Sequence, residues 1–213
     1  MICVSIAEHG LEASLKALDG LEMAEIRLDR TGLTVQEVKR LFSTHAKLIA
    51  TCRPGSLLEL ERKRLLLEAI EAGAAFVDLE LEAEESFREE ILKKAHAKGC
   101  RVIISYHNFE ETPAREALAA IVDRCFERGA GLAKIACAVR SGREAARLLG
   151  LLDSERELVV AGMGPLGRVT RLAAPLLGSP FTYASLGEGQ GTAPGQVAFR
   201  DLQKWLEAVR GPA

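Results

Sequence analysis

Eight apolar, β-rich runs, each followed by a segment with helical periodicity, recur along the 213 residues at intervals of about 25 residues. The expected strands span 1–6, 23–28, 47–52, 76–81, 101–106, 132–139, 157–161 and 181–185. The expected helices span 8–18, 34–42, 56–72, 86–98, 112–128, 141–152, 166–176 and 195–209. Strands that alternate with helices in this way pair in parallel through helical crossovers. Eight such units in one chain favour an α/β fold, a closed (β/α)8 TIM barrel, over an open doubly wound sheet.

The chain shows no Pro- or Ser-rich linker and no change of composition that would divide it. We therefore expect one barrel domain spanning residues 1–213. Segment 186–195, LGEGQGTAPG, is long for a connection between a strand and its helix and is rich in glycine. It is expected to form a mobile lid over the mouth of the barrel.

Charge and cysteine usage exclude several classes of protein. A formal charge of −2 and a pI near 6.2 leave no basic surface for nucleic acid or for acidic membranes. The start MICVSIAEHG does not resemble a signal peptide, and no run approaches the roughly 20 apolar residues of a membrane span. The five cysteines are widely spaced without a CxxC motif, and the four histidines lack metal-ligand spacing. These features favour a reducing cytoplasm and predict no metal site.

His107 is placed for chemistry by the end of a strand. It follows the apolar, β-branched run 101–106 and begins the polar turn 107–112. The carboxyl ends of strands are where both open and closed α/β sheets bind their ligands. His107 is therefore a candidate for proton transfer to or from a ligand.

Lys134 is the one ionisable residue in an apolar run that is expected to be a fully buried strand, next to Ala133 and Ile135. An unpaired ammonium is costly in such surroundings. Lys134 is therefore expected to be held as a neutral amine, which attacks carbonyl groups, or to pair with a strand-end acid such as Asp78 or Glu80. The sequence leaves both alternatives open.

Polar side chains end most of the expected strands. In AEIRLD the alternation places Glu25, Arg27 and Asp29 on one face, which is expected to point into the barrel. Further residues suited to binding or chemistry at the other strand ends are Arg53, Asp78, Glu80, Met163, Arg171, Thr192 and Gln196. A structural network of balanced charges around Arg27 is one explanation. It does not explain why five strands contribute polar ends together, which a binding site at the carboxyl face does.

The segment 162–167, GMGPLG, fits the G-x-G-x-x-G pattern of dinucleotide-binding proteins. That pattern normally opens a longer array of strands and helices, whereas only one expected strand follows here. The segment is better suited to an anion site after the seventh and eighth strands, with Arg171 and the loop 192–196 nearby. A carboxylate and a phosphate fit equally well.

Several motifs together resemble those of one known family. They are AEIRLD (24–29), ATCRP (50–54), VDLEL (77–81), ISYHNFEETP (104–113), AKIA (133–136), MGPLGRVTR (163–171) and YAS with GTAPGQ (183–196). Their order, and the 27 residues from His107 to Lys134, resemble the type I 3-dehydroquinate dehydratases of the shikimate pathway of aromatic amino-acid biosynthesis. The resemblance implies a (β/α)8 barrel, usually a homodimer, that converts 3-dehydroquinate to 3-dehydroshikimate without a metal or cofactor.

The resemblance also implies roles for individual residues. Lys134 looks like the lysine that forms a Schiff base with the substrate ketone, and His107 like the general acid and base. Either Asp78 or Glu80 would orient His107 or balance Lys134. The residues that would hold the substrate carboxylate are Arg171, Thr192 and Gln196. Those that would bind the ring hydroxyls are Glu25, Arg27 and Arg53, and Met163 would pack on the ring.

The chain departs from the family pattern at three places. Asn108 stands where an Asp often follows the histidine, which affects a contact outside the reacting groups. The chain begins directly at the first expected strand, without the N-terminal hairpin that can plug the barrel, so Met1 and the first turn are expected to close that end. The segment after Arg53 is short, so a family acid there corresponds ambiguously to Glu59 or Glu61, and neither is assigned to the site.

Two alternative functions compete with the dehydratase. A class I aldolase would share Lys134 and the anion site but would cleave a C–C bond. A non-catalytic barrel that binds a small carboxylate for sensing would need neither an imine-forming lysine nor a histidine within its reach. Detection of a covalent imine on Lys134 therefore separates an enzyme from a binding protein.

Overall fold

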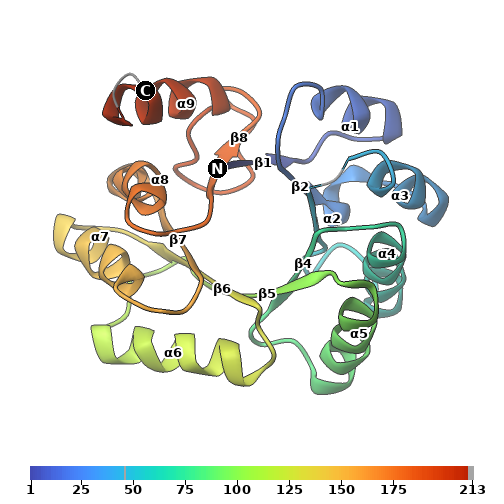
Figure 1. The fold of residues 1–213 in the computed structure, drawn as a ribbon, viewed down its shortest axis with the longest axis horizontal. Coiled ribbons are helices and arrows are strands. Elements are labelled where there is room, and N and C mark those ends of the chain that lie inside the picture. The colour runs from blue at the N-terminus through green and yellow to red at the C-terminus, as the bar shows by residue number, and fades with distance from the viewer. Residues whose placement is uncertain (46, 211–213) are drawn as a thin grey trace.

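The computed structural model describes residues 1–45 and 47–210 of the chain. Eight parallel strands form a ring and the longer helices lie outside it (Figure 1). The strands are β1 (Ile2–Ile6), β2 (Ala24–Arg27), β3 (Leu48–Thr51), β4 (Phe76–Glu80), β5 (Arg101–Asn108), β6 (Leu132–Ala138), β7 (Leu158–Met163) and β8 (Thr182–Ser185). They are ordered β8-β1-β2-β3-β4-β5-β6-β7, so the TIM barrel expected from the alternation of strands and helices is confirmed. In the described ranges no ladder joins β7 to β8, and the ring is nearly closed.

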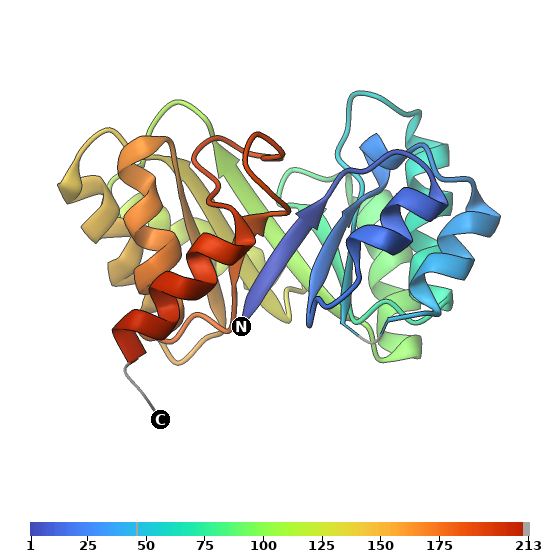
Figure 2. The same cartoon turned by 90° about the horizontal axis from the view of Figure 1, so that it is seen from above.

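The connecting helices return the chain from one end of the ring to the other (Figure 2). They are α1 (Leu11–Ala17), α2 (Leu28–Thr31), α3 (Val35–Phe42), α4 (Glu59–Glu71), α5 (Glu85–Lys98), α6 (Arg115–Glu127), α7 (Gly142–Leu149), α8 (Arg168–Ala173) and α9 (Phe199–Arg210). Short 3-10 turns flank α7 and α8. No helix in the described ranges combines the length and the apolar character that crossing a membrane requires.

Three local signals at helix ends act as expected. Thr34 caps α3 in a capping box with Glu37, and Ser141 accepts a hydrogen bond from the backbone N–H of Glu144 at the start of α7. Gly99 ends α5 with a φ of 69°, a left-handed conformation that favours glycine. These caps satisfy backbone groups that a helix end leaves without partners.

Several expected boundaries are wrong by a few residues. Strand β5 extends to Asn108, so His107 lies inside the strand instead of in the turn after it. Strand β2 ends at Arg27, and Asp29 belongs to the short helix α2. Helix α6 begins at Arg115 and not at 112, because the residue before Pro113 disfavours the helical conformation.

The interior of the amino end is filled by an apolar floor cluster. Its members are Cys3, Met23, Ile49, Ile103, Leu132, Val159, Phe181 and Tyr183, with Phe76 packed against them. All eight strands supply this layer from positions in or next to them, so the inward side chains themselves close the end. Met1 is 39% exposed and is not a member of this cluster, and the expectation that Met1 and the first turn help to close the end stays a prediction.

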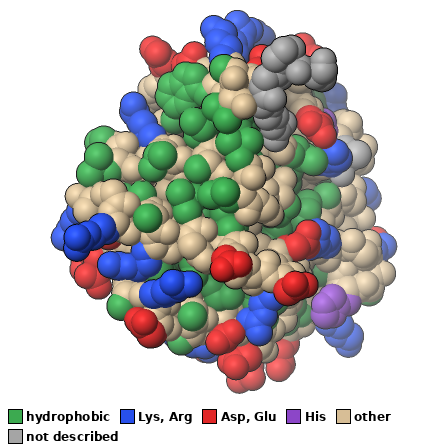
Figure 3. Space-filling model, turned by 60° about the vertical axis from the view of Figure 1, so that its left-hand side comes forward, with side chains coloured by type: hydrophobic (Ala, Val, Ile, Leu, Met, Phe, Trp, Pro, Cys, Tyr) green, Lys and Arg blue, Asp and Glu red, His purple; other side chains and the backbone are tan. Residues whose placement is uncertain are grey.

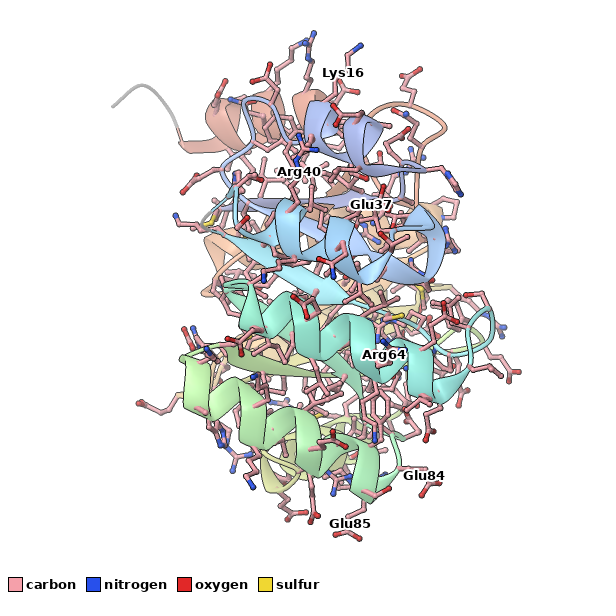
Figure 4. The ribbon with its side chains drawn as sticks, turned by 90° about the vertical axis from the view of Figure 1, so that its right-hand side faces the viewer. Lys16, Glu37, Arg40, Arg64, Glu84 and Glu85 are labelled. Carbon is pink, nitrogen blue, oxygen red and sulfur yellow. The ribbon has the colours of Figure 1, made fainter. Side chains whose placement is uncertain are left out.

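The outer surface mixes charged helix faces with an apolar region. Figure 4 shows labelled charged side chains on the outward faces of α3, α4 and α5, among them Glu37, Arg40 and Arg64. Figure 3 shows hydrophobic side chains gathered on one face of the molecule. The exposed large apolar residues on and around α8 and α9 are Leu166, Val169, Leu176, Leu177, Trp205 and Val209.

The glycines of 162–167 allow close packing between β7 and the turn that follows it. A Cβ on Gly167 would lie 2.6 Å from the backbone oxygen of Gly162, and one on Gly195 would lie 2.5 Å from the oxygen of Gly164. The N–H of Gly164 donates to the carbonyl of Pro194, which fixes the β8–α9 loop against this turn. Backbone contact explains the glycines of the G-x-G-x-x-G pattern without a dinucleotide.

Gly167→Ala is expected to lower the free energy of unfolding by about 1–3 kcal/mol, the usual effect of overpacking. The methyl group would collide with the Gly162 backbone, which cannot move without displacing β7. Urea denaturation measures the change. Gly150→Ala is the control, since Gly150 has a φ of −63° and no heavy atom within 4 Å of an added Cβ. Equal losses in the two variants would contradict the packing role of Gly167.

Candidate active site

A cavity of about 730 Å³ opens at the carboxyl ends of the strands. All but one of the residues expected in the site line it: Glu25, Arg27, Arg53, Glu80, His107, Lys134, Met163, Arg171, Thr192 and Gln196. Asp78 does not line it and lies behind Lys134 and Arg53, with which it pairs. Neither Glu59 nor Glu61 lines it.

Lys134 lies on β6, is only 6% exposed, and points its amine into the cavity between two carboxylates. Its Nζ is 3.1 Å from Oδ2 of Asp78 and 3.4 Å from Oε1 of Glu25. Glu25 also accepts hydrogen bonds from Ser5 (2.5 Å) and Thr51 (3.0 Å). The sequence left open whether Lys134 is neutral or paired. The structure shows it paired, and its partners are Asp78 and Glu25.

The ion pairs continue from Lys134 to the outside of the barrel. Arg53 donates to Asp78 (2.9 Å) and to Glu80 (2.8 Å). Arg62 reaches inward from α4 to Glu80 (3.1 Å) and also donates to the carbonyl of Cys52. This buried ion network thus joins β2, β3, β4, β6 and α4, and it fixes the position of the Lys134 amine.

The network keeps its acids ionised despite burial. Burial alone raises the pKa of the Asp78 carboxyl, but Arg53 and Lys134 hold that pKa well below its usual range. Burial likewise opposes ionisation of Glu25, and the Lys134 ammonium lowers the pKa of Glu25 below its ordinary value. Burial acts against the charge of Arg53, yet Asp78 and Glu80 raise its pKa. Each charge in the network therefore depends on its partners.

His107 is half-buried on β5 and lies on the same wall of the cavity as Lys134. In the register of β5 and β6, Ser105 pairs with Lys134 and His107 with Ala136, so the imidazole lies one inward position nearer the mouth. Burial, together with the charges of Arg53 and Lys134, lowers the pKa of His107 well below 6.5. The ring is therefore neutral near pH 7 and can accept a proton.

Neither Asp78 nor Glu80 orients His107 by a hydrogen bond. Its imidazole ring instead stacks on the ring of Phe109, with 6.2 Å between the centroids and 14° between the planes. Both acids are held by the arginines of the ion network and by Lys134. Of the two roles considered for them, balancing Lys134 falls to Asp78.

Arg171 is a buried cation without an acidic partner. It is 2% exposed, and in the described ranges it forms no ion pair, while its Nε has no hydrogen-bond partner. Its Nη1 donates to the carbonyl of Tyr183 (3.2 Å) on β8, the strand that no ladder joins to β7. Burial lowers the pKa of Arg171 to about 10. Because an unpaired buried cation is costly, this residue provides a site for an anionic group.

The β8–α9 loop brings Thr192 and Gln196 to the cavity. Oε1 of Gln196 accepts from the backbone N–H of Thr192 (2.6 Å), and its Nε2 donates to Ser5 (3.5 Å). Gln190 donates to Glu8 (3.1 Å) in the loop after β1. The loop therefore lies over the cavity in contact with its neighbours, and its expected motion as a lid stays a prediction.

Arg27 and Asp29 form a pair in the lining of the cavity, at the end of β2. Nε and Nη2 of Arg27 donate to the two oxygens of Asp29 at 3.0 and 2.7 Å, a bidentate arrangement. This pairing holds the guanidinium at the wall of the cavity. Met163, at the end of β7, adds an apolar surface to the same cavity.

Sequence reasoning missed several residues that contact the site, among them Tyr183. Ser5, Thr51 and Ser105 each follow the alternation of inward side chains on their strands, so the period of two would have identified them. Arg62 has no such signal, because it stands among the charged residues of α4. In the described ranges no group of three or more His, Cys, Asp or Glu is placed to hold a metal ion.

Comparisons with known proteins agree with this geometry. The sequence pattern of the type I 3-dehydroquinase family matches residues 2–211. The chain is 36% identical over 218 residues to the 3-dehydroquinate dehydratase of Methanococcoides burtonii, a match that covers 97% of this chain and 88% of that protein. It is 39% identical over 211 residues to that of Methanothermobacter thermautotrophicus, covering 92% and 91%.

Solved structures give the same result. The type I 3-dehydroquinate dehydratase of Clostridium difficile, determined with covalently modified comenic acid, superposes with a TM-score of 0.84 at 26% identity, covering 98% of this chain and 91% of that one. A 3-hexulose-6-phosphate synthase superposes with a TM-score of 0.59 at 19% identity and shares the fold alone. Because the family pattern extends over residues 2–211 and two relatives exceed 30% identity, the chain belongs to the type I 3-dehydroquinase family.

Proposed function

We propose that this protein is a hydro-lyase that converts 3-dehydroquinate to 3-dehydroshikimate, the third step of the shikimate pathway, through a Schiff base on Lys134. The observation that carries the proposal is that one cavity is lined by a buried lysine amine, a neutral histidine and an arginine without an acidic partner. Membership of the family supports the substrate. The covalently modified ligand of the Clostridium difficile relative supports covalent chemistry on this fold.

The reaction begins when His107 takes a proton from the Lys134 ammonium, and the free amine then attacks the substrate ketone. His107 returns this proton to the hydroxyl of the resulting carbinolamine, which loses water. The iminium ion that remains acidifies the neighbouring C–H bond. His107 removes that proton, and the electron pair forms the C=C bond of an enamine. The enamine expels the β-hydroxyl group, which takes the proton from His107 and leaves as water. Because one histidine serves both steps, the proton and the hydroxyl leave from the same face, a syn elimination.

The other cavity residues position the substrate. Arg171 has the charge and the free donors to hold the substrate carboxylate, with Thr192 and Gln196 as neighbouring polar groups. The residues assigned to the ring hydroxyls are Glu25, Arg27 and Arg53, supported by Asp78 and Glu80. Met163 supplies the apolar contact for the ring. Hydrolysis of the conjugated iminium then releases the product and restores Lys134.

Three further features stay predictions of this proposal. The chain is one catalytic domain over residues 1–213, it assembles as a homodimer, and it works in the cytoplasm. The five cysteines, all free and buried, are compatible with a reducing compartment. The apolar side chains on and around α8 and α9 offer a surface for a second copy of the chain.

Reduction with borohydride in the presence of 3-dehydroquinate is expected to attach the ligand irreversibly to Lys134. Peptide mass spectrometry locates the adduct, and Lys134→Ala should show neither adduct nor turnover. Lys63, at the surface on α4, provides the matched control, since Lys63→Ala should leave both unchanged. Binding without an adduct would favour a carboxylate-binding barrel, and cleavage of a C–C bond would favour an aldolase.

The value of kcat/KM is expected to stay level from pH 8 down past 6.5. The lowered pKa of His107 keeps the neutral, proton-accepting form present well below the pH at which an ordinary histidine becomes charged. Activity should decline only at more acidic pH. A pH series on the wild-type protein and on His96→Gln, which alters an exposed histidine on α5, measures this. A half-maximal value at pH 6.5 or above on the acid side would contradict it.

Arg171→Met is expected to lower kcat/KM by about 100-fold, mainly through a higher KM, since hydrogen bonds to charged groups contribute about 1.5–3 kcal/mol. Stability without ligand should not fall, because the variant removes a buried cation that has no acidic partner. Arg168→Met, on the exposed side of the same helix, is the control. An unchanged KM in Arg171→Met would exclude Arg171 from carboxylate binding.

A further inference from the structure

Tyr183 lies directly against the Lys134 amine. Its ring centroid is 4.0 Å from Nζ, a cation–π contact, and the residue is 3% exposed on β8 at the border between the floor cluster and the cavity. We infer that the face of this ring is a positioning element that stabilises the cationic nitrogen on Lys134, above all in the iminium stage of the reaction. The inference rests on the Schiff base of the proposed function and adds a residue to it.

The ring is held by packing and not by its hydroxyl group. Phe181 contacts it edge to face, with 5.5 Å between centroids and 72° between planes, and Phe76 packs on Phe181 in the same way at 6.0 Å and 64°. The hydroxyl oxygen of Tyr183 is buried without a hydrogen-bond partner in the described ranges. Burial, with the nearby charge of Glu25, raises the pKa of that hydroxyl well above 10, so it stays protonated. The ring face is therefore what Tyr183 offers to Lys134.

Counting hydrogens shows why the ring matters most after the imine has formed. The ammonium of Lys134 carries three hydrogens, and two of its N–H groups reach Asp78 and Glu25. Condensation of the ammonium with a ketone yields an iminium and one water molecule. The water carries two of the three hydrogens, and the positive charge stays on the iminium. One N–H remains, so one of the two carboxylate hydrogen bonds is lost.

The ring contact does not require an N–H. A cation is attracted to the negative face of an aromatic ring whatever hydrogens it carries, and the attraction is stronger where water is excluded. Tyr183 therefore retains its effect when Lys134 passes from ammonium to iminium. It favours both cationic stages over the neutral carbinolamine that lies between them.

The test reduces the negative potential on the face of the ring at position 183 and keeps the size and shape of the ring nearly constant. Tyr183→Phe is the reference, since the hydroxyl has no partner, and it should match the wild-type protein within about twofold in kcat. Phenylalanines carrying one, three and five fluorine atoms, incorporated at position 183, then withdraw electrons from the ring face in steps. We expect kcat and the amount of borohydride-trapped Lys134 adduct to fall together, by about tenfold across the series, with little change of KM. Thermal unfolding of each variant shows that the barrel remains folded.

Ile103→Ala is the matched control for packing. It removes buried apolar atoms from the same floor cluster, at a residue on β5 that makes neither a ring contact with Tyr183 nor a cation–π contact with Lys134. This variant should lose stability but keep its trapped adduct and its kcat within about twofold. Tyr183→Leu should lose both the trapped adduct and most of kcat.

The outcomes separate this inference from the proposed function. Trapping on Lys134 that is the same in the pentafluorophenylalanine and phenylalanine proteins overturns the role of Tyr183 and leaves the Schiff base standing. Equal losses of trapping in Ile103→Ala and Tyr183→Leu also overturn it, because packing alone then accounts for the effect. Absence of any adduct in the wild-type protein overturns both.

Discussion

The barrel depends on a buried ion network in its centre. The network holds three cations and three carboxylates: Lys134, Arg53, Arg62, Glu25, Asp78 and Glu80. Removing one member of such a network leaves a buried charge uncompensated, which typically costs about 3–5 kcal/mol. The inward layers of most barrels are apolar. In this barrel the apolar inward layer is the floor cluster at the amino end, and the layer above it is charged. The charged layer above the floor cluster therefore joins the walls of the site, and each of its charges is balanced by the others.

The balance of the network has a consequence for the substrate. Because the cations and carboxylates of the network match in number, Arg171 is left as an unmatched positive charge lining the same cavity. A ligand with one carboxylate completes the balance, and this is the physical reason for an anionic substrate. Burial, with the nearby charges of Arg53 and Lys134, lowers the pKa of His107 and keeps it neutral, and this supplies the base that the elimination needs. Charge neutrality thus links the binding of the substrate to its reaction.

Local signals predicted most of the fold and the centre of the site. A lysine in an otherwise apolar strand, and a histidine at the end of one, identified Lys134 and His107 because buried charge is rare without a purpose. Features that depend on tertiary packing could not be predicted. The contact of Tyr183 with Lys134 joins β8 to β6, two strands that do not pair, and Arg62 reaches the site from a helix. Asp29 lines the cavity with Glu25 and Arg27 as the alternation predicted, but it does so from the short helix α2, because β2 ends at Arg27.

The crystal structure of the borohydride-reduced complex with 3-dehydroquinate would test the central claim most directly. We predict a covalent bond from the former carbonyl carbon to Nζ of Lys134, the substrate carboxylate on the guanidinium of Arg171, and a ring nitrogen of His107 facing the carbon next to the bond. Asp78 should remain within hydrogen-bond distance of the modified nitrogen. An adduct on another lysine, or a carboxylate bound away from Arg171, would contradict the claim that one balanced network both places the amine and selects the ligand.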